Sequence, residues 1–260
     1  LFDLFQDQLR AEGVREEQII CLNFEEAENE DLCDYRALYD HVKSRMLPDK
    51  MNYIFLDEIQ HVTDYQKAVD SLFVKKNADV YLTGSNAYLL SGEIATLLTG
   101  RYVEIKMLPL SFKEFLEAMP QNNKSQYECF LEYMEYGGMP GNLPILKENL
   151  SDLDVYLEGI FSTIVYKDIM IRNNITDKTL LENTLKFIFD SIGSPISTKK
   201  ISDTLTSKGI STCNHTVINY INAFIDSFLI YKAERFDVKG KNLLVRDYKY
   251  YVADVGLRSY

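Results

Sequence analysis

Short apolar runs alternate with amphipathic stretches through the first 118 residues, and this alternation constrains the fold more than any other feature of the sequence. The apolar runs predict strands, and the stretches between them have helical periodicity. The expected strands are 18–26, 52–57, 78–85 and 102–108, and the expected helices are 1–13, 33–46, 64–76 and 87–100. Strands and helices alternating at this spacing are typical of a parallel sheet covered by helices. The sequence therefore predicts an α/β fold for residues 1–118.

The remaining residues have a different pattern. Helical periodicity is found at 127–136, 153–172 and 180–192. Two further amphipathic segments follow, 197–209 with a possible cap at Ser197 and 211–230 starting at a Ser/Thr cap, and they predict a helix-turn-helix. The segment after them alternates well enough to form a hairpin that turns near 239–241. We therefore expect three parts: the sheet domain 1–118, a helical region 119–178 and a winged-helix domain 179–260.

Charge is unevenly distributed along the chain. The net charge is −11, but residues 191–260 carry ten Lys/Arg against six Asp/Glu and are +4, which leaves −15 for the rest. Such asymmetry suggests separate partners for the two parts. The apolar stretches fall far short of the roughly 20 residues that cross a bilayer, and no signal-peptide pattern is present, so we expect a cytoplasmic protein. Four widely spaced cysteines without a histidine cluster predict reduced thiols rather than a zinc site.

Two adjacent carboxylates, Asp57 and Glu58, end the apolar run NYIFLD. A carboxylate directly after a parallel strand lies at the edge of the sheet where ligands bind. In nucleotide hydrolases the first acid holds hydrated Mg²⁺ and the second orients and deprotonates the attacking water. Asp57 therefore fits a metal ligand and Glu58 a catalytic base. The alternative interpretation is a strand that runs into a helix N-cap.

Small polar residues end the next apolar run, VYLTGSN. Thr83, Ser85 and Asn86 are expected at the same sheet edge as the acidic pair, and Ser85 or Asn86 is placed to sense a γ-phosphate. Arg101, after Gly100, could stabilise charge on a transferring phosphate. A surface or sheet-capping arginine is an equally good interpretation of Arg101. The three histidines are scattered, so we assign none a catalytic role, and we interpret the acidic run 25–31 as a solvated loop.

A phosphate-binding loop of the form GxxxxGK[ST] does not occur in these 260 residues. In a P-loop fold this loop precedes a helix that leads into the next strand, and here that helix is the first one, which starts at Leu1 without an N-cap. We therefore expect the loop to lie upstream of Leu1. The chain as it stands is predicted to bind ATP weakly or not at all.

Several of these motifs together resemble a known family. NYIFLDEIQHV, the stretch from LTGSN to KEFLE, YGGMP and KYYVADVGLR are similar to the bacterial and archaeal AAA-like ATPases whose P-loop domain is followed by a helical and winged-helix region. The resemblance implies an ATPase that uses ATP and Mg²⁺, with Asp57 and Glu58 as the Walker B pair, a sensor at Ser85 or Asn86, and Arg101 in a TGR motif. Members usually begin with the P-loop and continue into a nuclease-like domain, and neither is found here.

Two functions follow from this sequence. The first is a Mg-ATP-dependent switch in which nucleotide state in the sheet domain moves the helical and winged-helix part. The second is a DNA-binding or protein-binding winged helix with a degenerate, structural ATPase domain. Basic residues of the last segment favour DNA binding, namely Lys199, Lys200, Lys239 and Lys241. Against it, the second helix of the helix-turn-helix has no Lys or Arg, on which recognition helices typically rely.

Overall fold

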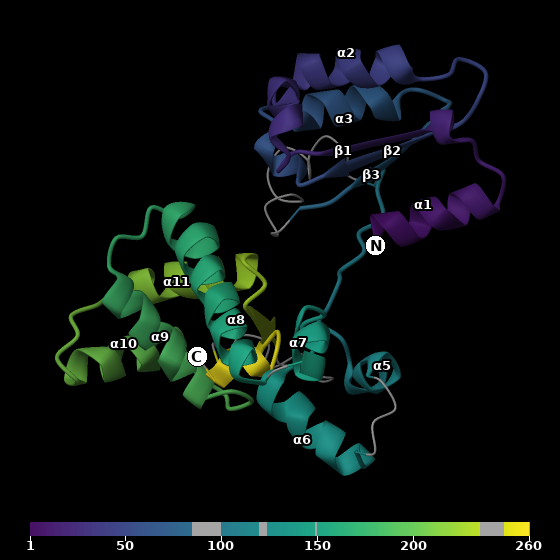
Figure 1. Ribbon diagram of the computed structural model, residues 1–260. Helices are drawn as coiled ribbons and strands as arrows, with labels where there is room; N and C mark the ends of the chain where they lie inside the picture. The colour runs from purple at the N-terminus through teal and green to yellow at the C-terminus, as the bar shows by residue number, and fades with distance from the viewer. Residues whose placement is uncertain (85–99, 120–123, 149, 235–246, 260) are drawn as a thin grey trace, which may run out of the picture. The chain divides into compact units, whose positions relative to one another are not determined.

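The computed structural model describes residues 1–84, 100–119, 124–148, 150–234 and 247–259 (Figure 1). The chain divides into two compact units, Leu1–Glu104 and Ile105–Tyr260. We describe each unit separately. The division at residues 118 and 178 stays a prediction.

The first unit is built on a three-stranded parallel sheet. Its strands are β1 (Ile19–Asn23), β2 (Asn52–Asp57) and β3 (Ala78–Leu82), in the order β1-β2-β3. The helices are α1 (Phe2–Ala11), α2 (Tyr35–Arg45) and α3 (Tyr65–Phe73), with 3-10 turns at Glu16–Gln18, Ala27–Leu32 and Ile59–His61. The predicted strand 52–57 is confirmed to the residue, and the other paired strands are shorter than predicted. Helices α2 and α3 connect successive parallel strands, which is the expected α/β arrangement.

Helices cover both faces of this sheet (Figure 1). On one face, α2 and α3 bury apolar side chains against β1 and β2, and Leu38, Ile54 and Leu72 are fully buried. On the other face, α1 places Phe2 and Phe5 against Phe55, with ring centroids 5.1 and 6.0 Å apart. Burial on both faces explains why β2 is a continuous apolar run rather than an alternating one.

The expected strand 102–108 is wrong. These residues are described, but they form no strand and pair with no described strand. Their apolar side chains are exposed, with Val103 88%, Ile105 73% and Met107 65% accessible. A strand needs a neighbour to satisfy its backbone N–H and C=O groups, and alternation alone cannot supply one. The helix expected at 87–100 lies almost wholly outside the described residues.

The second unit is mainly helical. Its first helices are α5 (Phe112–Ala118), α6 (Gln126–Tyr136), α7 (Asn142–Glu148) and α8 (Leu150–Thr163), and a π-helical segment, η5 (Ile164–Ile171), continues α8. The helix predicted at 153–172 is therefore confirmed as helical, with a change of hydrogen-bond period inside it. Ser111 and Ser125 each accept a hydrogen bond from the backbone N–H three residues on, and form the capping boxes that start α5 and α6.

The last part of this unit contains the expected pair of helices and a hairpin. Helix α9 (Lys178–Asp190) is followed by α10 (Thr198–Ser207), α11 (Asn214–Asp226), the antiparallel strands β4 (Ile230–Ala233) and β5 (Lys249–Val252), and a 3-10 turn, η6 (Gly256–Ser259). Ser197 caps α10 as predicted. The Ser/Thr cap expected for the next helix is wrong, because α11 has Cys213 as its N-cap residue. The predicted hairpin turn, with Lys239 and Lys241, lies outside the described residues.

A buried carboxylate joins two motifs that are 116 residues apart. Asp254 is 3% exposed and accepts hydrogen bonds from the backbone N–H of Gly138 at 2.7 Å and of Gly256 at 2.9 Å. Gly137 has φ +79°, and a Cβ there would overlap the Asp254 carboxylate. The YGGMP and YVADVGL stretches are therefore two sides of one structural contact.

Candidate functional site

Asp57 and Glu58 lie at the carboxyl edge of the sheet, where β2 ends. Asp57 is the last residue of β2 and pairs in register with Asn23 of β1. Glu58 then takes a left-handed backbone conformation, with φ 52°, which turns the chain away from the strand. Both side chains are half-buried. This edge is where open parallel sheets bind ligands.

Thr83, the residue after β3, holds both acidic residues in place. Its hydroxyl donates a hydrogen bond to Oδ1 of Asp57 and accepts one from the backbone N–H of Glu58 at 3.1 Å. The Thr83 carbonyl accepts from the N–H of Ile59 at 3.2 Å. One threonine thus links the ends of two neighbouring strands. It fixes the position of the Asp57 carboxylate and the turn at Glu58.

Two further metal-binding side chains lie beside Glu58. Glu25 follows β1, and His61 lies in the 3-10 turn after β2. One ligand atom from each of Glu25, Glu58 and His61 lies within 4.8 Å of the others. Gln60 Nε2 donates a hydrogen bond to Oε2 of Glu58. The edge therefore carries three carboxylates and an imidazole from two adjacent loops.

The structure places the other predicted site residues as follows. Ser85 and Asn86 lie outside the described residues. Arg101 lies 3.4 Å from the Asp70 carboxylate and 5.6 Å from the centroid of the Phe73 ring. Both partners are on α3, so the described contacts of Arg101 join it to a covering helix.

The sequence placed Thr83 at this edge, and its hydrogen bonds to Asp57 and Glu58 confirm that prediction. Sequence reasoning missed two other residues of the edge. Glu25 was assigned to a solvated loop, and His61 was given no role. A signal for Glu25 was available, since it lies at the carboxyl end of the predicted strand 18–26, two residues after the last residue of β1. For His61 the signal was its place three residues after Glu58.

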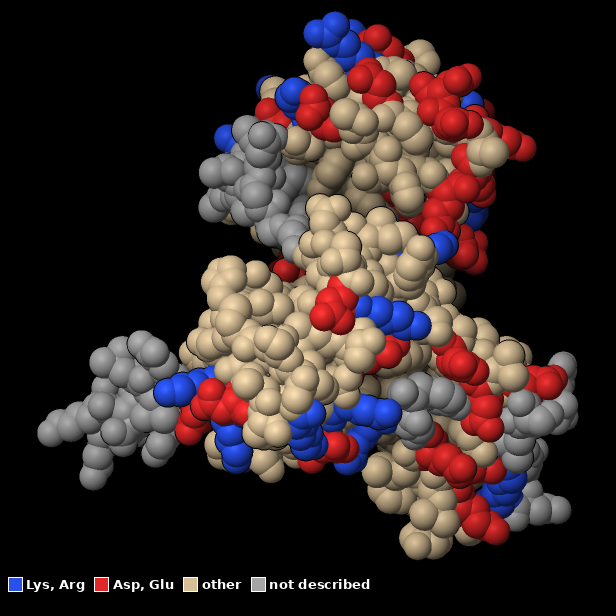
Figure 2. All heavy atoms as spheres, turned by 90° about the vertical axis from the view of Figure 1, so that its left-hand side faces the viewer, with Lys and Arg blue, Asp and Glu red and all other residues tan. Residues whose placement is uncertain are grey.

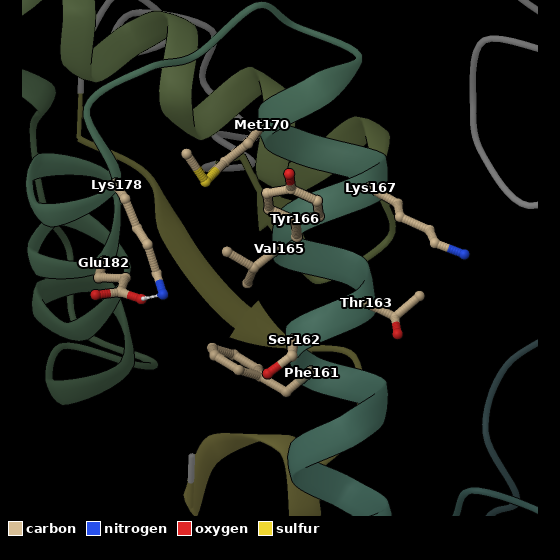
Figure 3. A pocket seen from close by; sticks show the side chains of 9 residues that line it. All are labelled: Phe161, Ser162, Thr163, Val165, Tyr166, Lys167, Met170, Lys178 and Glu182. Atoms are coloured by element: carbon tan, nitrogen blue, oxygen red, sulfur yellow. Dashed lines mark ion pairs between the residues drawn. The ribbon is translucent and has the colours of Figure 1, made fainter.

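A pocket of about 390 Å³ in the second unit is a less suitable site (Figure 3). Phe161, Val165 and Met170 of α8 and η5 form its apolar wall, facing α9. On α9, Lys178 and Glu182 form an ion pair at 3.4 Å. Of the two lysines that line the pocket, Lys178 is paired with this carboxylate and Lys167 points away from α9 (Figure 3), so the pocket offers little free positive charge for a phosphate. The carboxylate edge of the first unit is the better candidate for nucleotide chemistry.

Two family models match different parts of the chain. Residues 1–116 match the family described as AAA domain, and residues 127–260 match a domain of unknown function (DUF8612). The second match spans more than half of the chain, so the chain belongs to the family of this domain of unknown function, and its first 116 residues are similar to an AAA domain. A Walker-type ATPase of Pyrococcus abyssi has a similar fold, with a TM-score of 0.52 and 15% identity over 86% of this chain and 66% of that one.

Two relatives of this chain are uncharacterized proteins. One, from Haemophilus influenzae, is 40% identical over 98% of this chain. The other, from Methanocaldococcus jannaschii, is 32% identical over 77% of it. The chain spans 64% of the length of the first and 46% of the second.

The second unit offers a polar surface on its two-helix motif. Lys199 and Lys200, in the first turn of α10, are exposed. On α11 the exposed side chains include His215, Asn219 and Asn222, and His215 Nδ1 lies 3.3 Å from Asn219 Nδ2. Figure 2 shows the side of the molecule that lies to the left in Figure 1, and there blue Lys and Arg side chains of the second unit lie among red acidic ones. No helix among the described residues is long and apolar enough to span a membrane.

Proposed function

We propose that the full-length protein is a Mg-ATP-dependent ATPase whose nucleotide state acts as a switch on the second unit. The observation that carries the proposal is the placement of Asp57 and Glu58 at the carboxyl edge of β2, with Thr83 of the neighbouring strand bonded to both. The match of residues 1–116 to an AAA domain supports it.

The residues of this edge fit the roles that the chemistry needs. Mg²⁺ prefers oxygen ligands and usually takes one or two carboxylates. Asp57 would hold it, since Thr83 occupies Oδ1 and no described hydrogen bond reaches the other oxygen. Mg²⁺ bound with ATP neutralises charge that develops on the phosphates. Glu58 would orient the attacking water and accept its proton. Ser85 or Asn86 as γ-phosphate sensor and Arg101 as phosphate stabiliser stay predictions.

The test of the proposal is Glu58→Gln in the full-length protein. The variant keeps the shape of the side chain but cannot accept the proton, so turnover should fall by about 10²- to 10⁴-fold while nucleotide still binds. Glu28→Gln, an exposed glutamate of the loop after β1, is the matched control and should turn over ATP normally. Undiminished turnover in Glu58→Gln would remove Glu58 from the base role.

A thermal melt with and without MgATP tests nucleotide binding itself. MgATP at about 100 times its dissociation constant adds roughly 2.7 kcal/mol to the free energy of unfolding. We expect the melting temperature of the full-length protein to rise, and that of the 260-residue chain, which has no GxxxxGK[ST] loop, to change little. If the full-length protein shows no rise, the nucleotide site is degenerate.

The second candidate function is duplex-DNA binding by a winged helix formed by α9, α10, α11, β4 and β5. The exposed Lys199 and Lys200 at the start of α10 favour it, and so do the exposed amides of Asn219 and Asn222 on α11, because asparagine can pair with the adenine edge in the major groove. Reversing both lysines to glutamate should weaken binding and flatten its salt dependence. Lys113→Glu, an exposed change on α5, is the control, and equal binding by both variants would count against this interface.

A further inference from the structure

Three side chains that can bind a metal ion converge in the first unit. The proposed function uses only one of them, Glu58. Glu25 comes from the loop after β1, and Glu58 and His61 come from the turn after β2. The parallel pairing of Asn23 with Asp57 brings these loops together, and the N–H of Phe24 donates to the Asp57 carbonyl at 3.1 Å. One ligand atom from each side chain lies within 4.8 Å of the other two. Glu58 and His61 are neighbours in the sequence, and the register of β1 against β2 brings Glu25 to them.

The charge of this cluster is uncompensated. Within the part of the chain that the structure describes, no lysine or arginine forms an ion pair with Glu25 or Glu58, and His61 lies beyond ion-pair distance of both. Gln60 occupies only Oε2 of Glu58. Two carboxylates this close repel each other. A cation between them would remove this repulsion.

We propose that Glu25, Glu58 and His61 form a binding site for Zn²⁺, separate from the Mg²⁺ ligand Asp57. Zinc binds imidazole nitrogen and carboxylate oxygen, and its open sites use three protein ligands, the number and the donor types that this cluster offers. Mg²⁺ prefers oxygen ligands, so the imidazole favours a transition metal. Donor atoms on a tetrahedral zinc ion lie about 3.5 Å apart, given zinc–ligand bonds of about 2.0–2.2 Å. Small rotations of the exposed Glu25 and His61 side chains close the observed separation.

The site gives zinc a direct effect on catalysis, and this consequence rests on the proposed function. A zinc ion bound to Glu58 occupies the carboxylate that accepts the proton of the attacking water. Zinc therefore inhibits hydrolysis in the wild-type protein. The proposed hydrolysis assigns no step to His61, so we expect zinc to inhibit His61→Ala less strongly, relative to that variant's own turnover with Mg²⁺ alone, than it inhibits wild type.

Calorimetric titration of the full-length protein with ZnCl₂ tests the site without using activity. Wild type binds one zinc ion that His61→Ala and Glu25→Gln each bind at least about tenfold more weakly. His215→Ala removes an exposed histidine of α11 in the second unit and is the matched control, with unchanged binding. The free thiols, of which Cys21 and Cys213 are exposed, are the same in all four proteins, so the comparison isolates the cluster.

The outcomes separate the inference from the proposed function. Weaker binding in both cluster variants, with normal binding by His215→Ala, supports the site. No zinc binding by wild type, or equal binding by His61→Ala, overturns it. ATPase assays are a second arm, in which zinc inhibits wild type more strongly than His61→Ala, each relative to its own turnover with Mg²⁺ alone. If the protein shows no turnover with Mg²⁺ alone, the proposed function fails while the titration still decides the zinc site.

Discussion

Replacing Thr83 with valine tests whether this residue holds the acidic edge together. Valine has almost the same shape but no hydroxyl, so the change removes the hydrogen bond to Oδ1 of Asp57 and the one from the N–H of Glu58. A hydrogen bond to a charged group contributes about 1.5–3 kcal/mol and a neutral one about 0.5–1.5 kcal/mol. Because Thr83 is half-buried and water can replace part of the loss, we expect the free energy of unfolding to fall by about 2 kcal/mol.

Urea unfolding followed by circular dichroism measures this loss. The matched control is Thr63→Val. Thr63 is exposed and lies in the turn after β2, and the structure shows only its backbone bonded, to the Cys33 carbonyl at 2.8 Å. The control should change the free energy of unfolding by less than about 0.5 kcal/mol. Equal effects of the two substitutions would refute the argument that the Thr83 hydroxyl positions the edge. In the full-length protein, Thr83→Val should also lower ATP turnover, because Asp57 and Glu58 lose their common support.

Two further predictions concern the cores of the two units. Phe55→Ala should lower the free energy of unfolding by about 3–5 kcal/mol, because the fully buried ring packs against Phe2, Phe5 and Tyr81. Urea unfolding measures this loss, and a loss below about 1 kcal/mol would contradict the prediction. Burial raises the pKa of Asp254 above its ordinary value, although its backbone N–H bonds act in the opposite direction. The stability that a raised pKa contributes is present below the unfolded pKa, about 4, and is lost as pH rises through the folded pKa. We therefore compare the free energy of unfolding of wild type with that of Asp254→Asn, and expect the difference, wild type minus variant, to decrease between about pH 4 and pH 7. Urea unfolding of both proteins over this pH range measures the difference. An increase would show that the ionised form of Asp254 is the stabilising one.

Local patterns in the sequence were enough to predict most elements. β2 was predicted to the residue because a strand covered on both faces is a continuous apolar run that ends where polar residues begin. Gly13, with φ +91°, ends the first helix region, and Ser197 caps α10, since both act through backbone groups within a few residues. The cap of α11 was misassigned because Ser211, Thr212 and Cys213 are adjacent, and the geometry of the turn decides which of them precedes the first helical residue.

The acidic pair could also be predicted from the sequence, but the side-chain contacts that it makes with residues of the neighbouring strands could not. Asp57 and Glu58 are identified by their position directly after β2. Thr83 reaches them only because β3 pairs beside β2, and Glu25 reaches Glu58 only because β1 pairs on the other side.

What the sequence alone determined is therefore the α/β order of elements and the acidic pair, because helix periodicity, strand burial and capping depend on neighbouring residues. The tertiary structure decided which distant residues meet. Residues 102–108 have the alternation of a strand but join no strand that the structure describes, while Asp254 meets Gly138 across 116 residues. Strand pairing and buried carboxylate contacts join groups far apart in the chain, so no local pattern specifies them.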